Sequence, residues 1–556
     1  MSEFPVLTLP ALLETTVRQH INRPAVAFVG EEPITYADFF SKTKAVSALL
    51  EKLGVQPGDR VALLSANMPH WGITYFAIVS MGAVVVPLLP DFSGEEIKNV
   101  LRHSRAIAIF VSQGLTSKIA SSNIHSLKYK IAIEDFILLA GDSEVVFDEN
   151  VITEKEYPVA EDDLAAIIYT SGTTGKSKGV MLTHKNIAFN VYQGSTIREI
   201  TDKDRFLSVL PLPHVYENTI GFILPLTYGA CIYYLKKVPS PSVLIPAFQE
   251  VKPTFMLTVP LIIEKIYRAK VLPAFLDKKL IKKLYGKPFF RKKLNRMAGK
   301  KLLKTFGGEL IFFGIGGARI NEQVEKFLLE AKFPYAVGYG LTETAPLLAA
   351  FSPKEARLQA AGKVLEGVEV QIHNPDKTTG EGEVWARGSN VMKGYYKEPE
   401  LTAQVLTEEG WFRTGDLGIF DRDGYLYIRG RSKNVIIGPG GENIYPEEIE
   451  SVINNFKHVV ESLVVEQKGK LVALVHFDKD EIERKYNEIK EGVSGYVENF
   501  YNELSVDLKE YINSRVSRFS KIQRIIPQNE EFIKTATKKI KRFLYNEKTE
   551  ENGERI

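Results

Sequence analysis

The sequence predicts an α/β protein with a large N-terminal domain of mixed, mostly parallel sheets flanked by helices, followed by a small α+β domain. The chain has 556 residues, which is more than one hydrophobic core usually accommodates. Over residues 1–160, short apolar runs alternate with amphipathic helical patterns, as in a parallel sheet covered on both faces. A glycine-containing break at 430–433 precedes a shorter region with a hairpin pattern.

The first 160 residues supply the alternating elements in order. Helices are predicted at Ala11–His20 and Tyr36–Leu53, and Thr35 can cap the second one. Strands are predicted at Ala25–Val29 and Ala106–Val111. No internal repeat or low-complexity segment interrupts this pattern.

Residues 61–90 contain no Asp, Glu, Lys or Arg, and their length alone would allow a transmembrane helix. Prolines, glycines and polar residues interrupt the stretch, however. We therefore expect a buried strand at Val61–Leu64, a helix at His70–Met81 and a second strand at Ala83–Leu89.

A stretch rich in glycine and hydroxyl residues, YTSGTTGKSKG at Tyr169–Gly179, follows a strand predicted at Leu164–Ile168. Glycine permits close backbone approach, hydroxyls donate to phosphate oxygens and lysines supply countercharge, so the stretch suits a loop around an oligophosphate. A flexible surface turn is the alternative. It is not a Walker A loop, because Thr170 stands where that motif needs glycine. The donors are Ser171, Thr173 and Thr174, and the countercharges are Lys176 and Lys178.

The segment PLPHVYE follows a short strand predicted at Leu207–Leu210, after a helix predicted at Met181–Tyr192. Its prolines end the strand and present His214 and Tyr216 on a loop. A lone loop histidine is usually a surface residue, but ligands of α/β proteins bind at the carboxyl ends of strands.

Two further strands end in candidate ligand segments. GIGGARI follows the strand predicted at Glu309–Phe313, fails the dinucleotide fingerprint and offers bare backbone beneath a flat ligand. YGLTETAP continues the strand predicted at Tyr335–Tyr339. There the Tyr339 ring can stack on a base, Thr342 can bond a phosphate and Glu343 can hold Mg²⁺. A capped helix start is the alternative use of the threonine.

Asp416 lies within WFRTGDLG, in a predicted tight turn between strands. A carboxylate there can accept hydrogen bonds from two ribose hydroxyls, or it can bond its own backbone as an Asx-turn residue, and the residues alone do not separate these roles. Beyond it, the sequence predicts a boundary at Gly430–Lys433, a helix from Glu447, a hairpin of Ser462–Glu466 with Leu471–His476, a helical region at 481–520 and a disordered tail.

Residues 268–304 hold fourteen Lys and Arg but one acid, Asp277, with apolar residues interleaved. We favour a solvated helical hairpin, with a basic amphipathic surface on anionic lipid headgroups as the alternative. Nucleic acid would suit the charge, but no binding motif accompanies it, so none is expected as a partner. Cys231 is the only cysteine and no signal-peptide pattern is present, so we expect a cytoplasmic location.

Taken in order, these segments resemble the signature segments of adenylate-forming enzymes, the superfamily of acyl-CoA synthetases, luciferases and peptide-synthetase adenylation domains. The resemblance covers nearly the whole chain. Its motifs are YTSGTTGKSKG, PLPHVYE, GGARI, YGLTET, GEVWARG, WFRTGDLG, GRSKNVI, GGENIYPEEIE and KTATKKIKR. The HVYE motif and the basic insertion before the GGARI strand look most like those of long-chain fatty acyl-CoA synthetases.

The resemblance implies domains and residue roles. The domains are an adenylating N-terminal domain (1–429), a hinge (430–433) at Lys433, a mobile C-terminal lid (434–545) and a flexible tail (546–556). The ATP-binding residues are Thr170, Ser171, Gly172, Thr173, Thr174, Gly175, Lys176 and Lys178 at the phosphates, Gly316, Gly317, Ala318, Tyr339 and Gly340 at the adenine and acyl sites, Thr342 at the α-phosphate, and Asp416 and Arg431 at the ribose. The remaining roles fall to His214 at the mouth of the acyl pocket, Glu343 on Mg²⁺, Gly440 and Gly441 along the CoA path, and Lys539 on the carboxylate and α-phosphate.

The chain departs from the family at Lys538, where glycine usually precedes the catalytic lysine. Lys539 is preferred because it directly precedes Ile540, as the family lysine precedes an apolar residue. The resemblance implies ATP-dependent ligation of a long-chain fatty acid to CoA through an acyl-adenylate, and an oligomer is compatible with it. The alternatives are adenylation of a medium-chain or aryl acid, and transfer to a carrier-protein phosphopantetheine. A nucleotide-binding regulator without turnover is disfavoured, because the metal, ribose and lysine positions are all filled.

Overall fold

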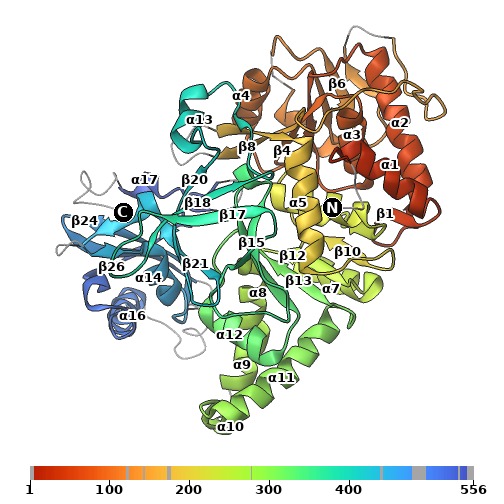
Figure 1. The fold of residues 1–556 in the computed structure, drawn as a ribbon. Helices are drawn as coiled ribbons and strands as arrows, with labels where there is room; N and C mark the ends of the chain where they lie inside the picture. The colour runs from red at the N-terminus through yellow and green to blue at the C-terminus, as the bar shows by residue number, and fades with distance from the viewer. Residues whose placement is uncertain are drawn as a thin grey trace.

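A computed structural model of the protein describes residues 6–120, 124–141, 144–171, 177–276, 279–438, 442–478, 482, 496–535 and 539–546. Within them, two large sheets are flanked by helices, and a small sheet domain forms the C-terminal part of the chain (Figure 1). The expected α/β class and the expected small C-terminal domain are both confirmed.

The eight-stranded sheet has a parallel centre and antiparallel edges. Its order is β19 (Gly394–Tyr395), β9 (Ser177–Thr183), β8 (Leu164–Ser171), β4 (Val84–Leu88), β3 (Arg60–Leu64), β5 (Ala108–Val111), β6 (Tyr129–Ala132) and β7 (Leu138–Ala140). The predicted strand–helix–strand unit within 61–90 is confirmed as β3, α3 (Pro69–Ser80) and β4. In the described part of the chain, no helix has the length and apolar character needed to traverse a bilayer.

The thirteen-stranded sheet is parallel from β14 to β1 and antiparallel from β17 to β14. Its order is β17 (Val368–His373), β18 (Gly382–Gly388), β20 (Phe412–Phe420), β21 (Tyr425–Arg431), β16 (Gly362–Val364), β15 (Leu347–Ala350), β14 (Tyr335–Gly340), β13 (Phe312–Ile315), β12 (Phe255–Thr258), β10 (Arg205–Ser208), β11 (Cys231–Tyr234), β1 (Pro24–Phe28) and β2 (Ile34–Thr35). Several ligand segments of the sequence therefore follow the carboxyl ends of neighbouring parallel strands.

Helices cover the sheets. Those of the large part are α1 (Leu9–His20), α2 (Tyr36–Lys52), α3, α4 (Gly94–Ser104), α5 (His184–Ile197), η2 (Glu217–Ile223), α6 (Leu224–Thr227), α7 (Pro241–Val251), α8 (Pro260–Ile266), η3 (Tyr267–Val271), α9 (Leu272–Leu276), α10 (Lys279–Tyr285), α11 (Pro288–Thr305), α12 (Glu322–Ala331) and α13 (Pro399–Val405), with short 3₁₀ turns η1 (Gln113–Lys118), η4 (Thr342–Thr344) and η5 (Ser432–Asn434). Thr35 caps α2 as predicted. Its hydroxyl accepts a hydrogen bond from the Asp38 amide, and the Asp38 carboxylate accepts one from the Thr35 amide.

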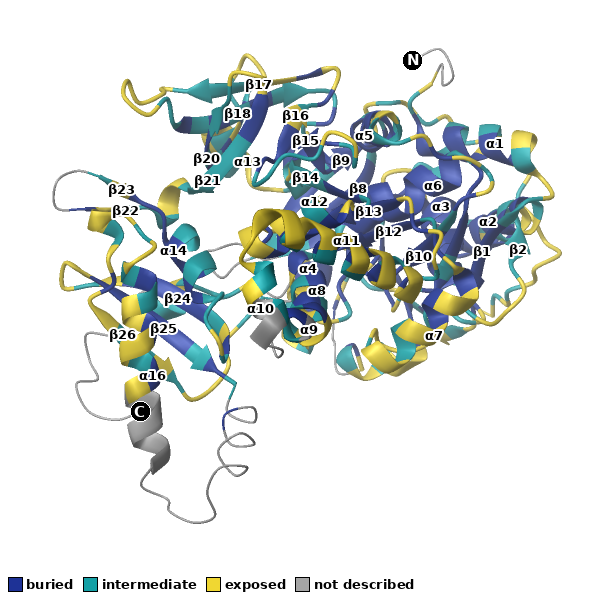
Figure 2. Ribbon diagram, turned by 90° about the horizontal axis from the view of Figure 1, so that it is seen from below, coloured by how far each residue is buried: buried dark blue, intermediate teal, exposed yellow. Residues whose placement is uncertain are grey.

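The core lies where α1, α2 and α3 pack against the sheets (Figure 2). Helix α3 is buried on nearly every face, as expected of a helix that is apolar all round. Its Trp71 and Tyr75 rings stack with centroids 5.3 Å apart. Both rings meet Phe222 of η2 edge to face, which joins this helix to the segment that follows His214.

The small domain holds a three-stranded sheet of β24 (Val459–Gln467), β25 (Lys470–Phe477) and β26 (Arg524–Gln528), the pair β22 (Ile436–Ile437) and β23 (Asn443–Ile444), helices α14 (Pro446–Ile453), α16 (Tyr496–Asn513) and α17 (Phe543–Asn546), and the turn η6 (Arg518–Ser520). The predicted hairpin is confirmed as β24 and β25. Most of 481–495 and all of 547–556 lie outside the described residues, so the predicted tail is not tested.

Five local predictions were wrong. The strand predicted at Leu207–Leu210 runs from Arg205 to Ser208. The helix predicted from Met181 begins at His184, because β9 continues to Thr183 as the antiparallel partner of β8. Tyr216 lies in the first helical turn instead of the loop. The strand predicted at Glu309–Phe313 runs from Phe312 to Ile315. Asp416 lies inside β20 and not in a turn, because that strand extends past the glycine at 415 to pair with β21.

Candidate active site

Three strands of the large sheet converge on the carboxylate of Asp416. Arg431, its direct neighbour across β20 and β21, approaches Oδ1 with Nε at 2.7 Å. The Tyr339 hydroxyl, at the carboxyl end of β14, donates to Oδ2 at 2.7 Å. Asp416 is only 5% exposed. Burial raises its pKa, and the Arg431 charge followed by the Tyr339 hydrogen bond opposes that shift.

Glu343 is tied to the β8–β9 hairpin through a tyrosine. It lies in η4 directly after β14, and its Oε1 accepts a 2.8 Å hydrogen bond from Tyr395. Tyr395 belongs to β19, which pairs with β9 at Val180. The Lys178 ammonium lies 5.1 Å from the centre of the same ring. The segment that starts at Tyr169 is therefore next to Glu343, as the phosphate-loop prediction requires.

Two lysines from the C-terminal side of the chain join these groups. Lys433 in η5 has its pKa lowered by burial and by the charges of Arg431 and Lys178. Desolvation and then Arg431 also lower the pKa of Lys539, while Asp416 and Glu343 oppose the change. Lys539 as a whole residue is exposed. The lowered pKa and the exposure of the residue agree, because a long side chain can expose its stem while its ammonium group lies among protein atoms.

His214 lies on the bend between β10 and η2, where the prolines of PLPHVYE end the strand. Burial lowers its pKa to about 4, and the Lys539 charge adds to that effect. The ring is therefore neutral at physiological pH. Its Nδ1 accepts a 3.3 Å hydrogen bond from the Tyr216 amide, so the ring proton lies on Nε2. The Lys539 charge is thus close enough to act on His214, although the two residues are 325 positions apart in the sequence.

The physical reason for a glycine differs from one position of the site to the next. A Cβ at Gly340 would lie 1.8 Å from Pro346 O, so backbone packing alone requires glycine there. A Cβ at Gly316 would lie 3.0 Å from the Tyr216 ring, which rests on bare backbone of the β13 end. Gly317 has φ +83°, the left-handed region that favours glycine. Gly317 and Ala318 are exposed and form the loop after β13.

Part of the predicted site is not described. Gly172, Thr173, Thr174, Gly175, Lys176, Gly440, Gly441 and Lys538 lie outside the described residues, and only the backbone of Ser171 is described. Thr170 pairs with Lys178 across the hairpin, and Thr342 is half-buried beside Glu343. Sequence reasoning missed Tyr395 as the partner of Glu343. Its only signal was an aromatic pair, YY, after the GEVWARG strand.

Among the described residues, no three His, Cys, Asp or Glu side chains gather as ligands of a metal ion. A single carboxylate nevertheless fits Mg²⁺, which often takes its other ligands from substrate phosphates and water. Glu343 is such a carboxylate, because it is half-buried, faces the cations of the site and keeps its second oxygen apart from the Tyr395 bond.

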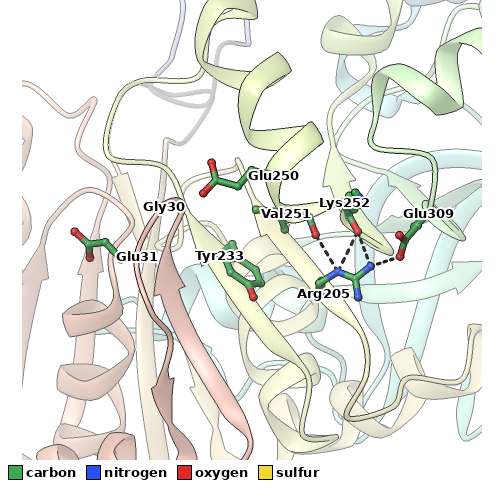
Figure 3. A pocket seen from close by; sticks show the side chains of 8 residues that line it. All are labelled: Gly30, Glu31, Arg205, Tyr233, Glu250, Val251, Lys252 and Glu309. Carbon is green, nitrogen blue, oxygen red and sulfur yellow. Dashed lines mark hydrogen bonds and ion pairs between the residues drawn. The ribbon is translucent and has the colours of Figure 1, made fainter.

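A separate open pocket of about 410 Å³ lies near the start of β10 (Figure 3). Its lining is Gly30, Glu31, Arg205, Tyr233, Glu250, Val251, Lys252 and Glu309, none of which is a predicted site residue. Arg205 already donates to the carbonyl oxygens of Val251 and Lys252 and pairs with Glu309. Arg205 is thus occupied by neighbouring protein groups, and none of the side chains that converge on Asp416 lines this pocket.

Comparison with known proteins agrees with this geometry. The model of the AMP-binding enzyme family matches residues 13–396. The long-chain-fatty-acid–CoA ligase FadD15 of Mycobacterium bovis is 29% identical over 488 residues, covering 81% of this chain and 78% of that protein. Long-chain-fatty-acid–CoA ligase 1 of Saccharomyces cerevisiae is 34% identical over 479 residues, covering 76% and 68%.

Solved structures show the same fold. The O-succinylbenzoate coenzyme A synthetase of Bacillus subtilis, in complex with ATP and magnesium ion, has a TM-score of 0.74 at 23% identity, over 96% of this chain and 98% of that one. The chain belongs to the AMP-binding enzyme family, as the motifs indicated. Within it, the chain is an enzyme of the acyl-CoA synthetase class, the AMP-forming acid–thiol ligases.

Proposed function

We propose that the protein is a long-chain fatty acid–CoA ligase. It first joins the fatty acid to AMP with release of pyrophosphate, and then transfers the acyl group to CoA with release of AMP. The long-chain substrate is supported by the two relatives described above, both named as long-chain-fatty-acid–CoA ligases, at 29% and 34% identity. The observation that carries the proposal is the convergence of Asp416, Glu343, His214 and Lys539 from four separate parts of the chain.

The charge of this cluster suits two anions. Four cations, Lys178, Arg431, Lys433 and Lys539, surround two carboxylates, so the cluster is net positive before substrates bind. A fatty acid carboxylate and a triphosphate repel each other, and the barrier falls when fixed cations neutralise that repulsion. The β8–β9 hairpin, from Thr170 to Lys178, holds the β- and γ-phosphates in this proposal.

The nucleoside is held at the three-strand junction. Asp416 accepts from the ribose hydroxyls, Arg431 fixes the carboxylate that does so, and the Tyr339 ring lies against adenine. Each Asp416 oxygen already has one protein partner, which fixes the orientation of its remaining lone pairs. The loop of Gly317 and Ala318 borders the adenine. Glu343 would hold Mg²⁺, which would supply charge stabilisation at the phosphates when bound.

The acid enters beside His214. Because this ring is neutral with its proton on Nε2, it can donate a hydrogen bond to the carboxylate without adding a further positive charge beside Lys539. The carboxylate oxygen attacks the α-phosphorus, where Thr342 and Lys539 stabilise the developing charge, and the bond to pyrophosphate breaks. The small domain then turns about Lys433 and replaces Lys539 with the Gly440–Gly441 segment. The CoA thiol attacks the acyl carbon, and AMP leaves with the former carboxylate oxygen.

A panel of carboxylic acids tests the substrate class. AMP release is measured with ATP, Mg²⁺ and CoA for saturated acids of graded length and for aryl acids. The proposal predicts the highest kcat/KM with long chains. A preference for aryl or medium-chain acids would contradict the proposed substrate. Thioester formation only on a carrier protein would contradict CoA as the acceptor. In either case, acid-dependent release of pyrophosphate would still support the adenylation step.

We also propose that the protein is cytoplasmic and contacts anionic membrane through residues 268–304. The inner face of α11 is fixed, because Arg291 forms a two-pronged ion pair with Glu330 of α12, and Asn295 donates to the same carboxylate at 2.8 Å. A Cβ at Gly299 would lie 2.7 Å from that of Ala331, so the two helices pack closely.

The outer face of α11 is consequently set toward solvent (Figure 2). Phe289 is 76% and Met297 62% exposed on it. The helix contains no acidic residue. Its exposed cations are Lys292, Lys293, Arg296, Lys300, Lys301 and Lys304. Apolar side chains among cations match an anionic bilayer, where each cation near the surface contributes ~1 kcal/mol.

Vesicle co-sedimentation tests this contact. The wild type should pellet with phosphatidylglycerol-containing vesicles at low salt, and 0.5 M salt or phosphatidylcholine alone should release it. The double change K293E and K300E should lose the binding. The matched control carries K377E and K468E, two exposed lysines elsewhere with the same change in net charge, and should still bind. Equal binding by both double variants would contradict the proposed surface.

A further inference from the structure

The small domain meets the large domain at the C-terminal end of α14. Arg268 of η3 donates hydrogen bonds to two backbone carbonyls of the small domain, from Nη2 to Asn454 O and from Nη1 to Val459 O at 3.3 Å. Asn454 is the C-cap residue of α14. The carbonyls at that end lack partners within the helix, and the helix dipole makes them attractive to a cation.

A second contact lies beside the first. Asn321 Nδ2 donates to Asn455 Oδ1 at 2.6 Å, across the same boundary. Asn321 is the N-cap of α12 and accepts from two amides of that helix. The N-terminal end of α12 therefore faces the C-terminal end of α14, so the two helix dipoles are complementary.

The docked helix is connected to the catalytic lysine. Arg542 pairs with Glu450 of α14, and the amide of Val464 donates to the same carboxylate at 2.7 Å. Arg542 is three residues beyond Lys539. The backbone at and after Lys539 is held by hydrogen bonds, because the Thr535 amide donates to Lys539 O at 2.8 Å and the Lys541 amide donates to Ile533 O at 2.9 Å. Because α14 is held on the large domain, these short contacts also fix the position of Lys539.

We propose that Arg268 is a positioning residue that latches the small domain in the orientation for acyl-adenylate formation. The inference rests on the proposed two-step function. Arg268 never touches substrate. It holds α14 so that Lys539 lies beside His214 and Asp416, and the latch must open before the domain turns toward CoA. The exposed pair of Arg319 and Glu448, at 3.3 Å, crosses the same boundary but contributes less because solvent screens it.

The two half-reactions separate this role from a general loss of stability. Acyl-AMP formation is followed by acid-dependent exchange of pyrophosphate into ATP, without CoA. Thioester formation is followed from supplied acyl-AMP and CoA. We expect R268A to lower the exchange rate about tenfold or more, the scale of one charged hydrogen-bonding group. It should leave thioester formation within about twofold, and R268K should recover part of the exchange rate.

The matched control is R205A. Arg205 also binds two backbone carbonyls, but both belong to the large domain (Figure 3). R205A should therefore affect the two half-reactions in equal proportion. Equal losses in R268A, or an unchanged exchange rate, would overturn the latch. Absence of exchange in the wild type would instead overturn the proposed two-step function, so the two failures are distinguishable.

Discussion

The Tyr339 hydroxyl donates a 2.7 Å hydrogen bond to Asp416, whose other oxygen is paired with Arg431. This contact joins the parallel half of the large sheet to its antiparallel half, at the place proposed for the nucleotide. Asp416 is buried at this junction, so loss of either partner would leave its charge without compensation.

The variant D416N tests the nucleotide role of this junction. It keeps the shape of the side chain but removes the charge that orients ribose and neutralises Arg431. We expect the KM for ATP to rise about 10- to 100-fold, the range of a charged hydrogen bond, with a small change in the KM for the acid. Steady-state kinetics with each substrate varied in turn provides the measurement. A KM for ATP equal to that of the wild type would exclude Asp416 from the nucleotide site.

Much of this junction follows from the sequence. The carboxyl ends of β10, β13 and β14 were predicted as ligand segments, because parallel strands end at one edge of a sheet. The antiparallel half of the sheet was harder to predict. The glycine before Asp416 suggested a turn, whereas β20 continues through it and pairs with Arg431. Single residues do not reveal such cross-strand partners, since they depend on register between strands.

Contacts between the domains could not be predicted at all. Arg268 was one of fourteen cations in a basic segment, and nothing local distinguishes it from the solvated ones. Its partners are backbone carbonyls, which leave no side-chain pattern. Tyr395 was missed for a similar reason, because its link to Glu343 arises only when β19 pairs with β9.

The variant K539A should separate the two half-reactions more strongly than any other. Without the ammonium group beside His214, acyl-AMP formation should fall ~10²- to 10³-fold, because one stabilising donor at the transition state is lost. Thioester formation from supplied acyl-AMP should be preserved. Rapid-quench measurement of each half-reaction gives both rates. Equal losses in the two would assign Lys539 a structural role.

Glu343 should set the requirement for Mg²⁺. The variant E343Q keeps the hydrogen bond from Tyr395 but removes the negative charge, so the Mg²⁺ concentration that gives half-maximal activity should rise at least tenfold. Titration of Mg²⁺ at constant ATP is the measurement. Y395F is the companion variant, which keeps the charge and should shift this concentration less. A Mg²⁺ requirement that is unchanged in E343Q would contradict the proposed role.

Glu217 makes stability depend on pH. It is 1% exposed, Ser208 donates to its Oε1 at 2.5 Å, and its Oε2 has no partner among the described residues. Burial raises its pKa from 4.5 to about 8. The folded state therefore holds a proton that the unfolded state releases between these values. The stability contribution is complete below pH 4.5 and is lost as pH rises through 8, by about 1.4 kcal/mol per pH unit.

The variant E217Q removes this titration. Urea unfolding at pH 5, 6.5 and 8 should show the variant gaining stability relative to the wild type as pH rises. S208A, which keeps the carboxyl group, is the matched variant and should retain the pH dependence. Parallel stability curves for E217Q and the wild type would mean that Glu217 is ionised when folded.

The most direct test of the central claim follows one oxygen atom. A long-chain fatty acid labelled with ¹⁸O in its carboxyl group is incubated with the enzyme, ATP, Mg²⁺ and CoA, and the AMP is analysed by mass spectrometry. The account predicts one ¹⁸O in each AMP, because the carboxylate oxygen that attacks the α-phosphorus stays with it when the thiol displaces AMP. Unlabelled AMP, or label in inorganic phosphate, would contradict an acyl-adenylate.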